Sequence, residues 1–248
     1  MILDTSTWVG HWPFQRLDPA TPAALMRKLH AEGVDQAWTA AADAVLYPDP
    51  QQGNEVWLPR VAKVRGLVPV AVIDPTLPNW PAALDRCVHD WGARVVRLVP
   101  SYHRLDLNDP RVDELVLAAA GRLAVSIQFR LEDERRHHPL MKVPPPAVDS
   151  VLALARRHPR TTFHLACAYL GEAVRLAAVP NVILEISSLE SMDTLCAATA
   201  KIPAGQLCFG SYTPFYYTHA AVLKLRHTEL DAAVVEAIGA GPAAWHGP

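Results

Sequence analysis

In the stretch Ser126-Ile-Gln-Phe-Arg-Leu-Glu-Asp-Glu-Arg-Arg-His-His-Pro139, a short apolar run ends abruptly in a block of charged residues and histidines. Residues 124–129 have the length and apolar character of a buried strand. Gln128 and Arg130 would then lie where this strand leaves the core. Such a charge cluster is either a solvated loop or the lining of a pocket. The pattern of the whole chain indicates which of the two it is.

The same alternation of apolar runs with helical segments recurs along the chain. Near-continuously apolar strands are typical of a parallel sheet that is covered on both faces. A length of 248 residues suits a (β/α)8 barrel, which commonly needs about 250. We therefore predict one α/β domain over residues 1–248, a single (β/α)8 TIM barrel. Its strands are expected at residues 2–5, 34–40, 67–73, 94–100, 124–129, 161–167, 182–187 and 207–211.

An open, doubly wound sheet is the alternative, but no glycine-rich phosphate fingerprint follows the first strand. Two helix starts carry capping signals. Thr21 precedes Pro22, and Asp109 precedes Pro110, so each pair fits an N-cap followed by a proline in the first turn. Other helices are expected at about 53–64, 81–91, 146–158, 171–178 and 191–200, and over much of 215–241.

The charge balance argues against nucleic acid and membrane partners. The chain has 25 acidic and 23 basic side chains, which gives a net charge of −2. No segment forms a basic face. No run approaches the roughly 18 apolar residues of a membrane span, and the chain enters a strand at once, so we expect a cytoplasmic protein with a small-molecule partner. A homodimer is left open. The cysteines, expected to be reduced and mostly buried, are Cys87, Cys167, Cys196 and Cys208.

In a parallel barrel, the residues just past the carboxyl end of each strand converge on one mouth, and the chemistry of such barrels takes place there. The predicted strands place a mixed polar and aromatic set at this mouth. Its members are Asp4, Ser6, Trp8, Asp43, Asp74, Arg97, Tyr102, His103, Gln128, Arg130, Glu132, Cys167, Glu185, Ser187, Ser211 and Tyr212.

Three segments, in order and at the right spacing, resemble a known family. They are Ile2-Leu-Asp-Thr-Ser-Thr-Trp-Val-Gly10, Val96-Arg-Leu-Val-Pro-Ser101 and Leu207-Cys-Phe-Gly-Ser-Tyr-Thr-Pro-Phe215. They are similar to the first-, fourth- and eighth-strand motifs of the amidohydrolase-related (amidohydrolase family 2) metal-dependent hydrolases. The branch concerned includes aminocarboxymuconate semialdehyde decarboxylase and the pyrone dicarboxylate lactonases. The resemblance covers nearly the whole chain and implies an amidohydrolase-like TIM barrel.

The positions that match the family's metal ligands carry other residues. They are Ser6, Trp8, Gln128, Cys167 and Tyr212. A hydroxyl, an indole, an amide and a phenol do not supply the donors that zinc requires, and only the thiol could ligate. We therefore predict no metal and no cofactor in this site. A relocated metal is the alternative, although His137 and His138 are adjacent and would point to opposite sides. Its other candidate ligands are His11 and His103.

Without a metal, the predicted mouth still gathers the guanidinium groups of Arg97, Arg130 and Arg135. A guanidinium at the centre of a barrel is costly to bury unless it meets an anion, and its planar fork suits a carboxylate or phosphate. It would either clamp an acidic ligand or pair internally. The internal partners we expect are Glu132, Asp133, Asp74 or Glu185.

A hydrolase without zinc needs a general base and fixed donors for the developing oxyanion. Cys167 is a weaker candidate, as a nucleophile, because its apolar neighbours would raise the pKa of its thiol. Aromatic residues near the strand ends could shape a flat pocket. We assign His103, Glu132, His137 and Tyr212 as candidate catalytic residues, and Ser6, Trp8, Arg97, Gln128, Arg130, Arg135 and Cys167 as candidate substrate-binding residues.

Taken together, these expectations predict a function. We expect a lactonase-like, metal-independent hydrolase of the amidohydrolase superfamily that acts on a small anionic substrate, either a carboxylate or a lactone. A small-molecule-binding barrel that has lost turnover is one alternative. A hydrolase or decarboxylase with a relocated metal site is the other.

Overall fold

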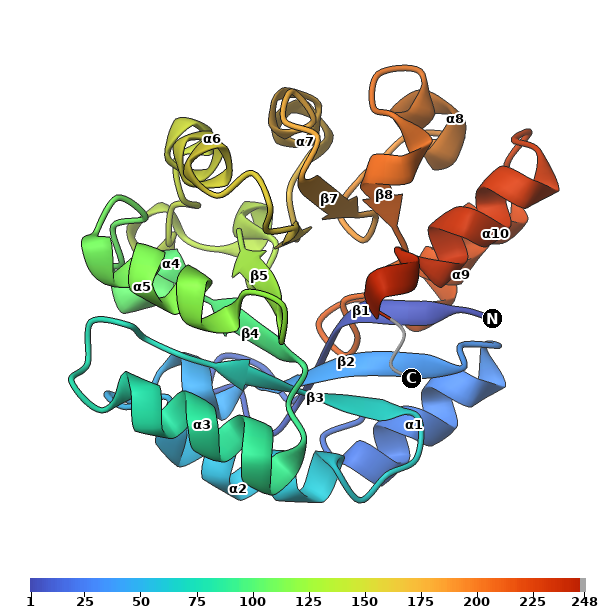
Figure 1. Cartoon of the computed structure of the whole chain (residues 1–248). Coiled ribbons are helices and arrows are strands. Elements are labelled where there is room, and N and C mark those ends of the chain that lie inside the picture. The colour runs from blue at the N-terminus through green and yellow to red at the C-terminus, as the bar shows by residue number, and fades with distance from the viewer. Residues whose placement is uncertain (246–248) are drawn as a thin grey trace.

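The computed structural model describes residues 1–245, and in them eight parallel strands alternate with helices (Figure 1). The strands are neighbours in chain order from β1 to β8. Each expected strand is present, which confirms the predicted (β/α)8 architecture. The strands are β1 (Leu3–Val9), β2 (Gln36–Ala41), β3 (Leu67–Val72), β4 (Val95–Leu98), β5 (Ala124–Gln128), β6 (Phe163–Ala166), β7 (Val182–Glu185) and β8 (Leu207–Cys208).

Hydrogen bonds between the first strand and the segment at β8 close the sheet. The Thr5 amide donates to the Phe209 carbonyl at 3.1 Å, and the Trp8 amide donates to the Thr213 carbonyl at 2.8 Å. Since both edges of the sheet are joined in this way, the doubly wound alternative is wrong.

Strand β1 is longer than the expected run of residues 2–5, and all seven of its residues are buried. Its polar side chains are satisfied inside the barrel. The Thr7 hydroxyl, for example, lies 2.8 Å from both the Trp38 carbonyl and the Thr39 hydroxyl. Because these partners come from another strand, the sequence pattern gave no sign of the extension. Ser6 and Trp8 therefore lie within β1 and not beyond its end.

The capping predictions are confirmed at two helices. The Thr21 hydroxyl accepts from the Ala24 amide at 3.4 Å, and the Asp109 carboxylate accepts from the Arg111 amide at 2.9 Å. The expected helix of residues 215–241 is divided into two, and the short helix α4 was not expected. The helices are α1 (Pro22–Ala31), α2 (Gln51–Val61), α3 (Trp80–Trp91), α4 (Pro100–His103), α5 (Pro110–Ala119), α6 (Val148–Arg157), α7 (Leu170–Leu176), α8 (Thr194–Thr199), α9 (Thr218–Arg226) and α10 (Ala232–Ala240).

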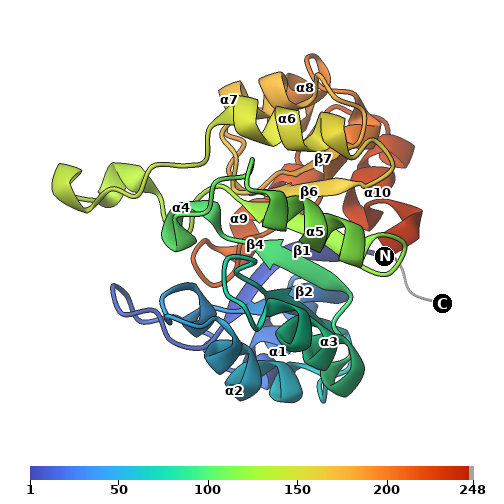
Figure 2. The same ribbon diagram turned by 60° about the vertical axis from the view of Figure 1, so that its left-hand side comes forward.

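The segment between β5 and α6 extends away from the barrel, as Figure 2 shows. It contains two short 3-10 turns, η2 (Glu134–Arg136) and η3 (Pro139–Met141). The charged stretch of the sequence therefore starts at the mouth and ends in solvent. Among residues 1–245, no helix is both long enough and apolar enough to cross a membrane.

Close packing of α2 against the turn η1 (Asp43–Val45) leads to a stability prediction. A Cβ added to Gly53 would lie 2.5 Å from the Ala44 amide nitrogen and 2.7 Å from its Cα. We expect Gly53→Ala to lower the free energy of unfolding by roughly 1–3 kcal/mol, as overpacked sites do. Urea denaturation measures this change.

Gly171→Ala in α7 is the matched control, since an added Cβ there meets nothing within 4 Å. That substitution should stabilise by up to about 1 kcal/mol, because alanine favours a helix more than glycine does. Equal gains at both positions would contradict the close contact between α2 and η1.

Candidate functional site

Four of the candidate residues meet at the centre of the barrel mouth. The Tyr212 amide donates to the Ser6 hydroxyl at 3.2 Å, and the Tyr212 ring packs edge-on to the Trp8 ring with centroids 6.4 Å apart. The Gln128 side-chain amide donates to the Tyr212 hydroxyl at 2.9 Å. All four side chains are buried. We call Ser6, Trp8, Gln128 and Tyr212 the central cluster.

Two of the donors in the central cluster, the Tyr212 hydroxyl and the Gln128 amide, are already engaged. The Tyr212 hydroxyl donates to the Arg130 carbonyl at 2.6 Å, and Gln128 Nε2 donates to the same oxygen at 2.5 Å. Burial raises the pKa of Tyr212 well above its ordinary value, so the phenol keeps its proton. These two side chains therefore hold the backbone just after β5, although they were predicted to be catalytic and substrate-binding residues.

Two residues of the mouth have unusual backbone conformations. Cys167 follows β6 and Tyr212 follows β8, and each has a φ of +60°. A left-handed conformation is uncommon for residues other than glycine and often occurs at functional sites. The Cys167 thiol lies 3.0 Å from the Ser188 hydroxyl and 3.6 Å from the Tyr216 hydroxyl. Burial raises its pKa to about 12, so it is a neutral thiol and a poor nucleophile.

Arg97 lies inside the barrel. Its Nε donates to the Ser126 hydroxyl at 3.1 Å, and one terminal nitrogen donates to the Thr5 carbonyl at 3.0 Å. Its guanidinium carbon is 4.9 Å from the centroid of the Trp8 ring. Burial lowers the pKa of Arg97 to about 10, which still leaves it charged at neutral pH. The other terminal nitrogen has no hydrogen-bond partner among the described residues.

Two carboxylates share this interior. Asp4 Oδ1 accepts from the amides of Ser6 and Ser211 at 3.1 and 2.9 Å. Glu185 accepts from the amides of Cys167 and Ser187, both at 2.6 Å. Burial raises the pKa of Asp4 to about 6, and the nearby charge of Glu185 adds to the effect.

The residues at the family's ligand positions do not fit a divalent cation. The Tyr212 phenol is a donor to a carbonyl, and the Cys167 thiol is protonated. A guanidinium, that of Arg97, already lies against the Trp8 ring among them. Zinc would require several unprotonated nitrogen, oxygen or sulfur donors in this place. In the described part of the chain, no three His, Cys, Asp or Glu side chains are grouped so that they could hold a metal ion.

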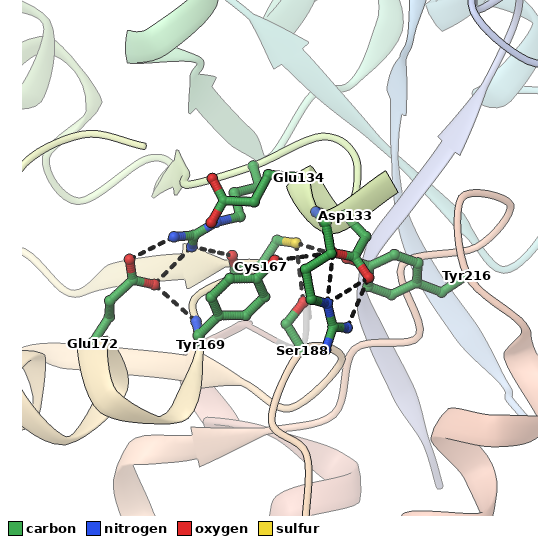
Figure 3. A network of polar contacts seen from close by, with 9 residues as sticks. Asp133, Glu134, Cys167, Tyr169, Glu172, Ser188 and Tyr216 are labelled. Atoms are coloured by element: carbon green, nitrogen blue, oxygen red, sulfur yellow. Dashed lines mark hydrogen bonds and ion pairs between the residues drawn. The ribbon is translucent and has the colours of Figure 1, made fainter. Parts of the chain in front are cut away.

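Arg130 is held in an internal ion pair. Its two terminal nitrogens lie 2.7 and 2.6 Å from the two carboxylate oxygens of Glu172, and its guanidinium carbon is 3.9 Å from the centroid of the Tyr169 ring (Figure 3). The Arg130 side chain is only 5% exposed. The sequence led us to expect Glu132, Asp133, Asp74 or Glu185 as the partner, and that expectation is wrong for Arg130. Glu172 had the appearance of an ordinary first-turn acid of helix α7.

Arg135 is the exposed arginine of the three, with 61% of its side chain accessible. Its guanidinium contacts Asp133, the partner we expected, and also Glu190 in the segment after β7. Both Arg130 and Arg135 lie near the Tyr169 ring, since the Arg135 guanidinium carbon is 5.9 Å from its centroid. The Tyr169 hydroxyl donates to Asp133 at 3.3 Å.

Glu132 and His137 form a pair. His137 Nε2 lies 3.3 Å from Glu132 Oε2, and both side chains are mostly buried. The neighbouring imidazole points elsewhere, because His138 Nδ1 accepts from the Leu140 amide at 3.3 Å. A cavity of about 10 Å³, large enough for one water molecule, lies beside the pair. This smaller cavity is lined by Gln15, Glu132, Asp133, His137, Phe215 and Tyr216.

His103 lies apart from this pair. It belongs to α4, and neither of its ring nitrogens has a hydrogen-bond partner among the described residues. Burial lowers the pKa of His103, which favours a neutral ring. The candidate catalytic residues are thus divided among three places: Tyr212 in the central cluster, the Glu132–His137 pair, and His103.

A larger cavity of about 300 Å³ opens at the mouth beside α9. Of the assigned catalytic and substrate-binding candidates, Arg135 lines it, and Ser187 and Ser211 of the predicted mouth line it as well. Lys224 also lines it and donates from Nζ to the carbonyls of Ile186, Ser187 and Leu189 at 2.8, 2.6 and 2.9 Å. No sequence pattern marks Lys224, which has the appearance of an ordinary basic residue late in a helix. The lining consists of Asp133, Arg135, Tyr169, Ser187, Ser188, Glu190, Ser211, Phe215, Tyr216, Tyr217, Ala220, Ala221 and Lys224.

Comparison with solved structures supports the same barrel. Over 96% of both chains, the protein is similar to 5-carboxyvanillate decarboxylase from Sphingomonas paucimobilis, with 14% identity and a TM-score of 0.71. It is also similar to a predicted amidohydrolase from Staphylococcus aureus, with 10% identity, 96% coverage of both chains and a TM-score of 0.71. A probable 2-pyrone-4,6-dicarboxylic acid hydrolase from Acinetobacter baumannii, with citric acid bound, matches over 94% of both chains at 13% identity and a TM-score of 0.62.

No family model matches the sequence, and no curated protein matches it. At identities of 10 to 14%, the structural likeness shows the fold. The expected amidohydrolase-like TIM barrel is therefore confirmed at the level of architecture.

The raised pKa of Asp4 leads to a prediction on stability and pH. A carboxyl group whose pKa is higher in the folded state stabilises the fold while protonated, and this contribution is lost as the pH rises through the folded-state value. From a pKa of about 6, we expect wild type to lose about 3 kcal/mol relative to Asp4→Asn between roughly pH 4 and pH 8. Urea denaturation of both proteins across this range measures the difference. A constant difference would show that Asp4 titrates normally.

Proposed function

We propose that the protein hydrolyses a small anionic compound, a lactone or a carboxylate-bearing ester, bound in the larger cavity, without a metal ion. The observation that carries this proposal is the position of the Glu132–His137 pair. The smaller cavity beside the pair and the larger cavity share three lining residues, Asp133, Phe215 and Tyr216. A volume of about 300 Å³ is in the range of ligand pockets. Two of the similar structures are, by name, a decarboxylase of an aromatic carboxylate and a probable hydrolase of a pyrone dicarboxylate.

In the proposed reaction, the Glu132 carboxylate, 3.3 Å from His137 Nε2, favours the proton on that nitrogen, which leaves Nδ1 to accept a proton from water. The water oxygen forms a bond to the substrate carbonyl carbon. The Tyr216 hydroxyl, which burial keeps protonated by raising its pKa, donates to the developing oxyanion. The carbon–oxygen bond of the lactone or ester then breaks, and His137 returns its proton to the departing oxygen.

A binding protein without turnover is the second candidate. The central cluster favours it, because Tyr212 and Gln128 donate to the Arg130 carbonyl and not to a ligand. A screen of lactones, aromatic carboxylic acids and their esters separates the two. Thermal stabilisation identifies ligands, and chromatography detects products. Ligands without products from any of them would support the binding protein.

For a substrate found in that screen, His137→Ala should lower kcat by about 10²–10⁴-fold, the usual contribution of a general base. KM should change little, because His137 does not line the larger cavity. His138→Ala is the matched control, since this neighbouring imidazole turns away from Glu132 to cap η3. Equal losses for both variants would remove His137 from the reaction.

Metal removal tests the remaining part of the proposal. Dialysis against a chelator should leave both the thermal stability and the turnover unchanged, because the central cluster offers a cation no anionic donor set. Elemental analysis of the purified protein provides the second measurement. Zinc or manganese retained in stoichiometric amount through dialysis would support a relocated metal site, with hydrolysis or decarboxylation as its chemistry.

A further inference from the structure

The Arg135 guanidinium is shared by two carboxylates at the rim of the larger cavity. Asp133 takes one edge, with Nε 2.8 Å from Oδ1 and Nη2 2.7 Å from Oδ2. Glu190 takes the outer edge, with Nη1 3.0 Å from Oε2 and Nη2 3.1 Å from Oε1. Two parallel N–H···O bonds on that outer edge are the geometry in which arginine recognises a ligand carboxylate.

The two carboxylates are held differently. Asp133 is 18% exposed, and it also accepts from the Arg135 amide at 3.0 Å and from the Tyr169 hydroxyl at 3.3 Å. Glu190 is 64% exposed, and Arg135 is its one hydrogen-bond partner among the described residues. Exposed ion pairs contribute at most about 1 kcal/mol. Asp133 therefore fixes the guanidinium, whereas Glu190 can leave at little cost.

The charges of the cavity favour an exchange of Glu190 for an anion. With Glu190 in place, Arg135 and Lys224 are balanced by Asp133 and Glu190. Lys224 gives its three hydrogens to backbone carbonyls, so it contributes charge but no free donor. Once Glu190 turns into solvent, the lining keeps one positive charge in excess, which a single carboxylate neutralises.

The other arginines of the mouth are committed. Arg130 is paired with Glu172, and Arg97 is buried in the barrel interior. Aromatic rings are available beside Arg135, since Tyr169, Tyr216 and Tyr217 line the same cavity. These rings suit a flat molecule.

We infer that the outer edge of Arg135 is a recognition site for an aromatic monocarboxylate, and that Glu190 occupies this site in the unliganded protein. The inference rests on the proposed function for the location of the ligand, and it adds the residue that selects the acid. A bound acid replaces the Glu190 carboxylate on Nη1 and Nη2, while Asp133 keeps its own edge.

The test is a panel of aromatic acids, each paired with its methyl ester, with binding measured by ligand-observed NMR. Wild type should prefer acids to their esters. Arg135→Gln should weaken acid binding by about tenfold or more, the effect of losing charged hydrogen bonds, and change ester binding less than about twofold. Glu190→Gln should tighten acid binding by up to about fivefold, because the internal competitor loses its charge.

Arg111→Gln is the matched control. Arg111 pairs with Asp109 across the same two-residue spacing, with the same amide-to-carboxylate bond, but it lies at the start of α5 away from the cavity. Acid affinity should be unchanged in this variant. If no acid binds wild type more tightly than its ester, or if Glu190→Gln leaves acid affinities unchanged, the inference is overturned.

The recognition site and the hydrolase function can be rejected independently of each other. Acid binding that depends on Arg135, without hydrolysis of any compound, would reject the hydrolase and keep the recognition site. Hydrolysis that is insensitive to Arg135→Gln would support the hydrolase and reject the recognition site. If Arg135→Gln disturbs the fold, ester binding will fall together with acid binding. The change in acid affinity caused by Glu190→Gln then tests the recognition site.

Discussion

The arrangement of the mouth depends on one backbone carbonyl. The Arg130 oxygen accepts from both Tyr212, in the segment after β8, and Gln128, the last residue of β5, so it joins the ends of two strands that are three places apart in the barrel. All of these groups are buried, and a buried carbonyl without partners would be costly. The same bonds turn the Arg130 side chain away from the axis, towards Glu172 and Tyr169. The centre of the barrel is therefore filled by protein, and space for a ligand is left at its edge.

Electrostatics explain why such a centre is stable. Arg97 keeps its charge in the interior, where it faces Asp4, Glu185 and the Trp8 ring. Each carboxylate also accepts hydrogen bonds from backbone amides, which stabilise its charged form. Asp4 nevertheless retains an oxygen without a partner in the described structure, and its raised pKa reflects that incomplete compensation.

The sequence predicted the fold well because the information is local. Apolar runs of strand length, the caps at Thr21 and Asp109, and the chain length are each read from a few neighbouring residues. The convergence of Ser6, Gln128 and Tyr212 was also predictable once the strands were in order. The pairing of Arg130 with Glu172 was not, since the two lie 42 positions apart and charge alone does not choose among several acids. Lys224 was missed for the same reason, because its partners are backbone carbonyls, which no sequence pattern marks.

A filled centre also determines where chemistry can occur. The larger cavity lies between the segment after β5, the segment after β7 and helix α9, and its rim includes Asp133 and Arg135 of the charged stretch after β5. Within that stretch the residues separate by burial. Glu132 and His137 turn inward beside a water-sized space, whereas Arg135 stays exposed and available to exchange partners. A loop and a pocket lining were the two alternatives for this segment, and it is both, because the 3-10 turn η2 (Glu134–Arg136) separates the inward-facing Glu132 and His137 from the exposed Arg135.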